Sequence, residues 1–451
     1  MAIAATIEWE VRTTATANNA NGGGFKPGAS GTDYSQQDAA QYNLTGVTTA
    51  AADAILLDAN AAAAMVGNIA HIVSGTNFTV GWYEIISVVV GTSITLDRTC
   101  TTAAGAAGVV NIGGALSLGH STDDSLFESL EPGNIVHIKV GSYSPTSISM
   151  AKVGTSSLPI TLRGYNAARN DAPTGANRPT LAFGANTSSF ANYVNQENIE
   201  FTTTTFSGTE VRSDARAVNC KSTNSSVTAG RPGFYVVNGS LIGCEAVSTN
   251  GNAVNVAASN SRISYCYIHD SSTGIALNTT SVNSISKTII ETISATGISI
   301  GSGATDHTVS DVTMYGAATP AGSSIGINLA ATTGINHHFE NIIISGFVDP
   351  IISAAVVGSN SYRYINIHNC TNAVTNVTLD EGSATDDPGF VDAPNGNFAV
   401  GTNMKATGGP ATFPGGLTAN YLDRGAVQRI EPTGGSSGGA RIMINGSVSG
   451  G

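Results

Sequence analysis

The sequence has little charge of either sign. Only 11% of its 451 residues are Asp, Glu, Lys or Arg, against roughly 25% in an average globular protein. Acidic residues number 31 and basic residues 19, which gives a net charge of −12. A surface that follows nucleic-acid phosphates needs clustered Lys and Arg. The composition therefore argues against nucleic acid as a partner.

Cysteine is scarce and has no regular spacing. The five cysteines form an odd set without a CxxC pair: Cys100, Cys220, Cys244, Cys266 and Cys370. Such a set disfavours both a disulfide framework and a zinc site. No other ligand spacing in the sequence indicates a metal or a cofactor, and we expect neither.

The N-terminal stretch MAIAATIEWEVRTT lacks a basic region followed by an apolar run. Both features mark a secretory signal, and a longer apolar run would mark a membrane span. We therefore expect no signal peptide, no membrane insertion, and synthesis and assembly in the cytoplasm of a cell.

A repeat runs through the middle of the chain. The pattern is an apolar residue, two residues, a small or apolar residue, one residue and another apolar residue. Its middle positions are Ile199, Cys220, Cys244, Cys266, Thr288, Val312, Ile342 and Ile365. Their mean spacing is near 24 residues. A Gly-Ile pair follows three of these positions, at Gly274, Gly297 and Gly326.

The repeat predicts an all-β fold. Apolar residues two apart match the alternation of a strand, whereas a helix has a period of 3.6 residues. Short strands that recur every twenty or so residues, with Gly, Ser, Thr and Asn between them, are typical of a parallel β-helix. In that fold, successive coils stack about 4.8 Å apart.

A short helix is predicted before the repeats, at residues 121–131, with the sequence STDDSLFESLE. Ser121 is a candidate N-cap with Asp124 three residues later, a variant of the capping box. Leu126, Phe127 and Leu130 give the helix an apolar face. We expect it to cover the open end of the first coil, where strand edges would otherwise be unpaired.

The helix, the segments PGNIVHIKVGSY and LPITLRGYNAARNDAPTGANRPTL, and the repeats resemble right-handed parallel β-helix proteins of the pectate-lyase-like superfamily. Residues 386–429 resemble the closing segment found on many members. The resemblance implies a single-stranded right-handed parallel β-helix with a small N-terminal β-domain and a short capping helix. It implies no function, because this fold carries lyases, hydrolases and inert fibres alike.

The sequence divides into five predicted regions. They are an extended Gly-rich arm (1–45), a small β-domain that docks on a partner (46–118), the parallel β-helix (119–385), its closing segment (386–430) and a Gly/Ser-rich tail (431–451). Trp82 and Tyr83 are expected to pack inside the small β-domain.

The stretch SRISYCYIHDSSTGIALN, residues 261–278, combines Cys266, His269 and Asp270. Cys266 occupies the repeat's middle position and is expected inside the coil as a small hydrophobe. His269 and Asp270 follow the repeat, and the next coil is expected to bring Glu291 beside His269. These three polar residues are either the acid–base machinery of a glycan hydrolase or lyase, or a polar ladder on the surface.

No other catalytic residues are assigned. The clustered Asp residues with which pectate lyases hold calcium are missing, as are the paired Asp and the Gly-His-Gly of polygalacturonases. Asp123-Asp124 lies in the predicted capping helix and Asp386-Asp387 in the closing segment. Neither pair falls on a repeat.

The N-terminal pieces NGGGF, YEIISV, ITLDR and GGALS resemble the first parts of β-helix proteins from tailed bacteriophages. This implies a homotrimer in the virion, docked through its N-terminal region on the major capsid or tail protein. We expect a non-enzymatic structural protein on the exterior of a phage particle, of the capsid decoration (cement) or fibre type. The alternative is a tailspike that binds or depolymerises host-surface polysaccharide.

Overall fold

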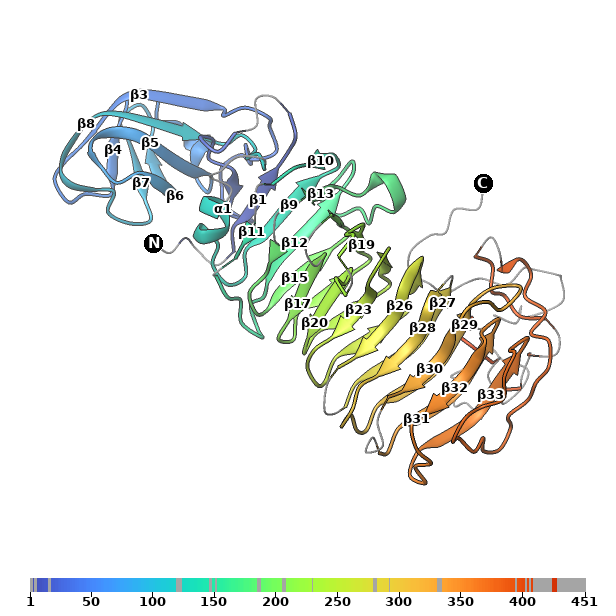
Figure 1. Ribbon diagram of the computed structural model, residues 1–451. Coiled ribbons are helices and arrows are strands. Elements are labelled where there is room, and N and C mark those ends of the chain that lie inside the picture. The colour runs from blue at the N-terminus through green and yellow to red at the C-terminus, as the bar shows by residue number, and fades with distance from the viewer. Residues whose placement is uncertain are drawn as a thin grey trace, which may run out of the picture. The chain divides into compact units, whose positions relative to one another are not determined.

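The structure is a computed structural model (Figure 1). It describes residues 3, 6–14, 18–118, 124–145, 148–150, 152–184, 188–204, 208–228, 230–278, 282–291, 293–330, 335–393, 396–401, 404, 407–408 and 424–427. The chain forms two compact units, Met1–Glu200 and Phe201–Gly451. Both consist almost entirely of β-strands, which confirms the predicted all-β class.

Unit 2 is a parallel β-helix, as predicted. One of its faces is a sheet to which each coil adds one parallel strand, visible in Figure 1 from β17 to β32. In order, the strands are β17 (Thr209–Arg212), β20 (Phe234–Val237), β23 (Asn252–Val256), β26 (Ser271–Leu277), β28 (Ile293–Ile300), β30 (Ile325–Leu329) and β32 (Asp349–Ser353).

A second face carries the predicted repeat. Its strands are β18 (Arg216–Val218), β19 (Lys221–Asn224), β21 (Ser240–Ile242), β22 (Glu245–Ser248), β24 (Arg262–Ser264), β25 (Tyr267–His269), β27 (Ser284–Glu291), β29 (Thr308–Tyr315), β31 (His338–Ser345) and β33 (Ser361–His368). Each coil bends just before the repeat's middle residue. There Tyr265, Lys287, Asp311 and Asn341 have φ angles of 57°, 49°, 53° and 58°.

The strand register agrees with the repeat. Thr288 pairs with Val312, and Val312 pairs with Ile342 in the next coil; all three are fully buried. Cys266 is buried, as expected for a residue inside the coil. The Gly-Ile pairs also align, and a Cβ atom on Gly274 would lie 2.6 Å from the carbonyl oxygen of Gly297. Glycine is therefore required for the coils to approach this closely.

A ladder of side chains stabilises one inner corner of unit 2. The Asn283 amide oxygen accepts the backbone N–H of Ser261 at 2.9 Å. His307 Nδ1 accepts the N–H of Asn283 at 3.1 Å, and His337 Nδ1 accepts that of His307 at 3.3 Å. The Asn360 amide oxygen closes the series by accepting the N–H of His337 at 3.0 Å. Because both Nδ1 atoms are acceptors, both imidazoles are neutral.

Unit 1 contains a closed six-stranded barrel, drawn in blue in Figure 1. Around the barrel the strands are β3 (Tyr42–Thr49), β4 (Ile55–Leu57), β7 (Ser93–Leu96), β6 (Gly81–Val89), β5 (Ile69–Phe78) and β8 (Thr101–Ile112), with a 3-10 turn, η1 (Ala63–Met65). Tyr83 lies in the barrel core. Trp82 is buried and stacks on His71, with ring centroids 4.5 Å apart.

Unit 1 also contains parallel β-helix strands. They are β9 (Ile135–Lys139), β10 (Ser142–Tyr143), β11 (Ile148–Ser149), β12 (Ile160–Tyr165), β13 (Thr180–Gly184), β14 (Ser188–Ser189) and β15 (Val194–Glu197), with a 3-10 turn, η2 (Gly175–Asn177); β16 (Glu200–Thr203) lies at the unit boundary. The edge of β9 is covered by β1 (Glu8–Val11), which runs parallel to it, while β2 (Gly24–Phe25) pairs antiparallel with β1.

The predicted capping helix is α1 (Asp124–Ser129). Leu126, Phe127 and Leu130 are buried, as expected, while Ser121 lies outside the described residues. The paired edge of β9 was not foreseen, because Glu8–Val11 falls in the range expected to be an extended arm. The alternation in β1 explains its place: Trp9 and Val11 are apolar and buried, while Glu8 and Glu10, at the alternate positions, form ion pairs with Arg169.

The closing segment folds back on unit 2. Backbone hydrogen bonds join Val391 to Ala399 at 3.0 Å and Asp392 to Asn397 at 3.1 Å. Phe398 is fully buried in a cluster that includes Ile289. The tail at 431–451 lies outside the described residues. Among those described, no helix is both long and apolar enough to cross a membrane.

Candidate functional site

Two columns of side chains lie on the outer surface of the repeat-bearing face, because alternate residues of a strand point to opposite sides. The Tyr267 column consists of Glu245, Tyr267, Ile289, Thr313, Ile343 and Asn366. The His269 column consists of Val247, His269, Glu291, Tyr315, Ser345 and His368. Ile268 pairs with Ile290 in the next coil, which puts the following residue, Glu291, in the His269 column, where the sequence predicted it.

A chain of ion pairs crosses between the columns. Lys221 Nζ lies 2.8 Å from Glu245 Oε1, and the same oxygen lies 3.2 Å from His269 Nε2. His269 Nδ1 lies 2.8 Å from Asp270 Oδ2. Both imidazole nitrogens thus face carboxylates, an arrangement that favours a cationic His269.

The pKa values follow from this geometry. Burial raises the pKa of Glu245, but the hydrogen bonds from His269 and Lys221 outweigh it and bring the pKa to about 2. Burial lowers the pKa of His269, and its two carboxylate partners more than reverse this, so the net pKa is raised. Glu245 is therefore ionised at neutral pH and lies between Lys221 Nζ and His269 Nε2.

Glu291 has a different environment. Its carboxyl accepts a hydrogen bond from the Tyr267 hydroxyl, and no described cation forms an ion pair with it. Burial raises the pKa of Glu291 above its usual value, and the nearby charge of Asp270 adds to this rise; the Tyr267 hydroxyl and the charge of His269 oppose it. Tyr267 also stacks on the His269 ring, with centroids 4.4 Å apart. We call Glu245, Tyr267, His269, Asp270 and Glu291 the polar cluster.

The polar cluster contains the three candidates from the sequence and two residues that the sequence analysis did not select. Asp270 has a φ angle of 49° at the turn between β25 and β26, and its side chain is 60% exposed. His269 contacts Asp270 directly, whereas Glu291 contacts Tyr267. Glu245 and Tyr267 could have been found, since each lies two residues before a member of the His269 column.

The closing segment covers part of this surface. Ile289 belongs to the outer Tyr267 column, yet only 3% of it is exposed, because Phe398, Ala393 and Val427 pack against it. Further along, Tyr315 contacts Phe390 and Phe398. A cavity of about 410 Å³ lies between this segment and the end of the His269 column. The polar cluster and the cavity therefore belong to one surface.

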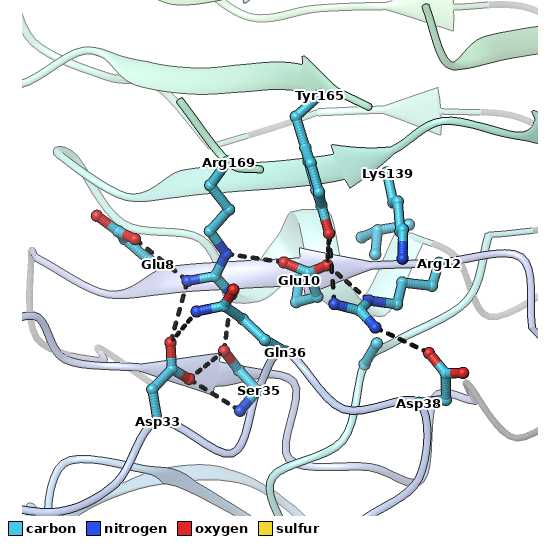
Figure 2. A network of polar contacts seen from close by, with 12 residues as sticks. Glu8, Glu10, Arg12, Asp33, Ser35, Gln36, Asp38, Lys139, Tyr165 and Arg169 are labelled. Carbon is cyan, nitrogen blue, oxygen red and sulfur yellow. Dashed lines mark hydrogen bonds and ion pairs between the residues drawn. The ribbon is translucent and has the colours of Figure 1, made fainter. Parts of the chain in front are cut away.

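Unit 1 has a separate polar cluster, the N-terminal ion network shown in Figure 2. At its centre the fully buried Glu10 contacts Arg12 Nε at 2.7 Å and Arg169 Nε at 2.8 Å, and it accepts a hydrogen bond from the Tyr165 hydroxyl. Arg169 also lies 3.2 Å from Asp33. The network links β1 to the coil that contains β12, through Tyr165 and Arg169, and to the loop that carries Asp33.

Within the described part of the chain, no group of three or more His, Cys, Asp or Glu side chains is arranged to hold a metal ion. The five cysteines are free thiols, four of them buried.

No family model matches the chain, and no curated protein matches it. Solved structures similar to it include pectate lyase Pel9A, which is 11% identical, with 70% of this chain and 92% of the lyase covered and a TM-score of 0.49. A PL6 family polysaccharide lyase from Pseudopedobacter saltans is 15% identical, with coverages of 55% and 74% and a TM-score of 0.39. The catalytic unit of a GH87 alpha-1,3-glucanase from Streptomyces thermodiastaticus is 12% identical, with coverages of 78% and 86% and a TM-score of 0.33.

These structures have parallel β-helix folds. Likeness at this level carries no argument about the activity of this chain, and it does not bear on a bacteriophage origin, which stays a prediction.

Proposed function

We propose that the chain binds a glycan along the outer face of unit 2 and cleaves it at the polar cluster. This is the tailspike alternative from the sequence. The observation that supports it is the contrast between carboxyl groups on one surface: Glu245 has a pKa of about 2, while burial raises the pKa of Glu291. Glycosidases use such a contrast, since one carboxyl must be protonated and another ionised.

The contacts assign roles to Glu291, Asp270 and His269, while Glu245 holds the His269 imidazole through their 3.2 Å contact. Glu291 retains a proton more readily than an ordinary glutamate and donates it to the glycosidic oxygen as the bond from that oxygen to the anomeric carbon breaks. A water molecule then bonds to the anomeric carbon and gives a proton back to Glu291, so that the products are two shorter glycans. Asp270 is the most exposed carboxylate of the cluster, and its negative charge stabilises the positive charge that develops on the sugar ring. His269 holds Asp270 in place through their 2.8 Å contact.

The test is a depolymerisation assay with the purified chain and a panel of neutral and acidic polysaccharides. We expect wild type to shorten at least one polymer and Glu291→Gln to lower the rate by about 10²- to 10⁴-fold, the usual contribution of a general acid. Glu340→Gln, on an exposed position of β31, is the matched control and should cleave normally. A folded wild type that cleaves none of the polymers would refute the proposal.

A second candidate is a structural protein on the exterior of a bacteriophage particle, either decoration or fibre. The surface of the barrel favours it. Leu57 on β4 and Val89 on β6 both pair with Ser93 and are 48% and 60% exposed. Exposed apolar side chains that lie together often mark a protein contact. In this proposal, unit 1 docks on the major capsid or tail protein, and the chain forms a homotrimer in the virion.

Copy number in purified particles separates the two candidates, and a variant of the exposed barrel surface tests the docking proposal. A Leu57→Asp/Val89→Asp variant should be lost from assembled particles while its polysaccharide cleavage is unchanged. Quantitative mass spectrometry of purified particles would give the copy number, which follows the capsid lattice for decoration and is a few per tail for a tailspike. Equal incorporation of variant and wild type would contradict docking through this surface.

A further inference from the structure

The closing segment forms one wall of the cavity at the end of the His269 column. The cavity measures about 410 Å³, within the range of roughly 300 to 1,000 Å³ that small-molecule pockets occupy. Its other wall comes from the coils, where Tyr315, Ser345 and His368 point outward from β29, β31 and β33. None of these three residues has a role in the proposed acid chemistry.

Hydrogen bonds and packing hold in place the wall that the closing segment forms. Besides the hydrogen bonds at Val391 and Asp392, the N–H of Gly401 donates to the carbonyl of Pro388 at 2.8 Å. Phe398 anchors this segment because its ring is fully buried in the cluster that contains Ile289 of the coils. The cavity is therefore formed before any ligand arrives, which lowers the cost of binding.

The lining has an apolar side and a polar side. Tyr315 and Phe390 supply aromatic rings whose centroids are 6.2 Å apart, edge to face. The polar side of the lining is formed by Ser345, His368 and Asp387. Ser345 Oγ lies 3.5 Å from His368 Nδ1, and His368 Nε2 lies 4.0 Å from Asp387 Oδ1. Contacts of this length leave the imidazole and the carboxylate able to bond a ligand.

This combination indicates the class of ligand. A sugar ring presents C–H groups on its faces and hydroxyl groups at its edge, so it can contact an aromatic ring while it hydrogen-bonds polar groups. A phosphate or uronic acid would meet Asp387 with only His368 to offset the like charge. A neutral sugar matches the lining better than an anion does.

We propose that the cavity binds one neutral sugar unit of the glycan that is cleaved at Glu291, an inference that rests on the proposed function. Tyr315 lines the cavity and pairs directly with Glu291 in the preceding coil. Adjacent strands are about 4.8 Å apart, so the bound sugar lies beside the proton donor. The cavity thereby determines which glycosidic linkage of the bound glycan reaches Glu291.

The experiment measures binding of four neutral hexasaccharides, maltohexaose, cellohexaose, laminarihexaose and mannohexaose, with trigalacturonate as the acidic comparison. Calorimetry and saturation-transfer NMR are run on the full chain. His368→Ala removes the imidazole from the lining, and Asp387→Asn replaces a carboxylate that accepts at both oxygens with an amide that accepts at one. Asp387 is exposed, so that variant should keep the fold. Their matched controls are His338→Ala and Asp386→Asn, two exposed positions outside the lining.

At least one neutral hexasaccharide should bind, and trigalacturonate should not. A lost hydrogen bond is worth about 1 kcal/mol, so each lining variant should raise Kd by roughly five- to tenfold. Both controls should bind like wild type. With a polymer substrate, the lining variants should raise KM and leave kcat within about twofold, since they touch binding and not the proton donor.

The outcomes separate this inference from the proposed function. If no neutral hexasaccharide binds, or if both lining variants bind as wild type does, the cavity is not a sugar site. If wild type cleaves a polymer and the lining variants keep its KM, the cavity inference fails while the function stands. If hexasaccharides bind in the cavity but no polymer is cleaved, the cavity stands and the catalytic proposal fails.

Discussion

The N-terminal ion network of unit 1 and the polar cluster of unit 2 are built from the same materials, outward-facing carboxylates on parallel strands. They differ in how their carboxylates are paired. In the network, the buried Glu10 contacts both Arg12 and Arg169. In the polar cluster, Glu245 is likewise held by Lys221 and His269, whereas Glu291 has a tyrosine hydroxyl as its partner.

The difference separates structural charges from chemically active ones. A buried carboxylate between cations stays ionised, and removing one cation leaves an uncompensated charge. A half-buried carboxyl without a cation holds its proton to a higher pH. Glu10 therefore serves to hold β1 in place, whereas Glu291 is available for proton transfer.

Arg169→Met should strongly destabilise unit 1. The substitution leaves Glu10 with one cation fewer and also removes the Asp33 contact. Breaking a buried ion pair in this way costs about 3 to 5 kcal/mol of unfolding free energy. The measurement is urea unfolding followed by tryptophan fluorescence, which reports on unit 1 because Trp9 and Trp82 are the only tryptophans.

Lys152→Met is its control, because Lys152 forms a partly exposed pair with Glu131 at 2.9 Å. Such pairs are worth less than about 1 kcal/mol. If the two variants lose the same stability, the N-terminal ion network does not stabilise unit 1 more than a partly exposed ion pair does.

The His307–His337 ladder should make unit 2 acid-sensitive. Burial lowers the pKa of His307 from 6.5 to about 4 and lowers that of His337 as well. A lowered pKa means that the folded state binds fewer protons than the unfolded one, so stability falls as the pH drops from 6.5 toward 4. The loss between pH 7 and pH 4 should be about 3 kcal/mol from His307, and His337 adds to it.

Circular dichroism of urea unfolding at pH 7 and pH 4 measures this loss. A His307→Asn/His337→Asn variant keeps an acceptor at each rung, as Asn283 and Asn360 already do. It should lose less stability between the two pH values than wild type does. An equal loss in both proteins would place the acid sensitivity elsewhere.

Glu291→Gln should leave unit 2 as stable as wild type or slightly more so. Because the pKa of Glu291 is raised, its contribution is fully present below pH 4.5 and is lost as the pH rises through the folded pKa. The variant should match wild type at pH 4 and exceed it by less than about 1 kcal/mol at pH 7. Glutamine that destabilises the fold at pH 7 would indicate that Glu291 is a structural charge.

Lys221→Met should have the smallest effect. The Lys221–Glu245 pair is partly exposed, and such pairs contribute less than about 1 kcal/mol. The substitution should instead raise the pKa of Glu245, because one of its two stabilising cations is gone. Carbon-13 NMR of the labelled carboxyl, with Lys287→Met as control, measures that shift. An unchanged Glu245 pKa would mean that His269 alone holds the carboxylate ionised.

Much of unit 2 could be predicted because its signal is local. The alternation around Cys266, Thr288 and Val312 determines which side chains face inward, and the repeat spacing determines which residues stack. The same reasoning placed His269 next to Glu291. It missed Glu245 and Tyr267, because only one outward column was followed. It also missed β1, because a single strand far from the repeats has no neighbour in sequence that shares its pattern.

By itself, the sequence determined the all-β class, the stacking of the coils and the buried place of Cys266, since strand alternation and a regular period act between near neighbours. The packing of the folded chain decides that Phe398 covers Ile289, that Arg169 pairs with Glu10, and that Glu291 has a tyrosine hydroxyl as its partner. These depend on where distant segments return to the surface of a coil. These segments decide how deeply a charged side chain is buried and which partner it contacts, and burial and partner together set the pKa of that side chain.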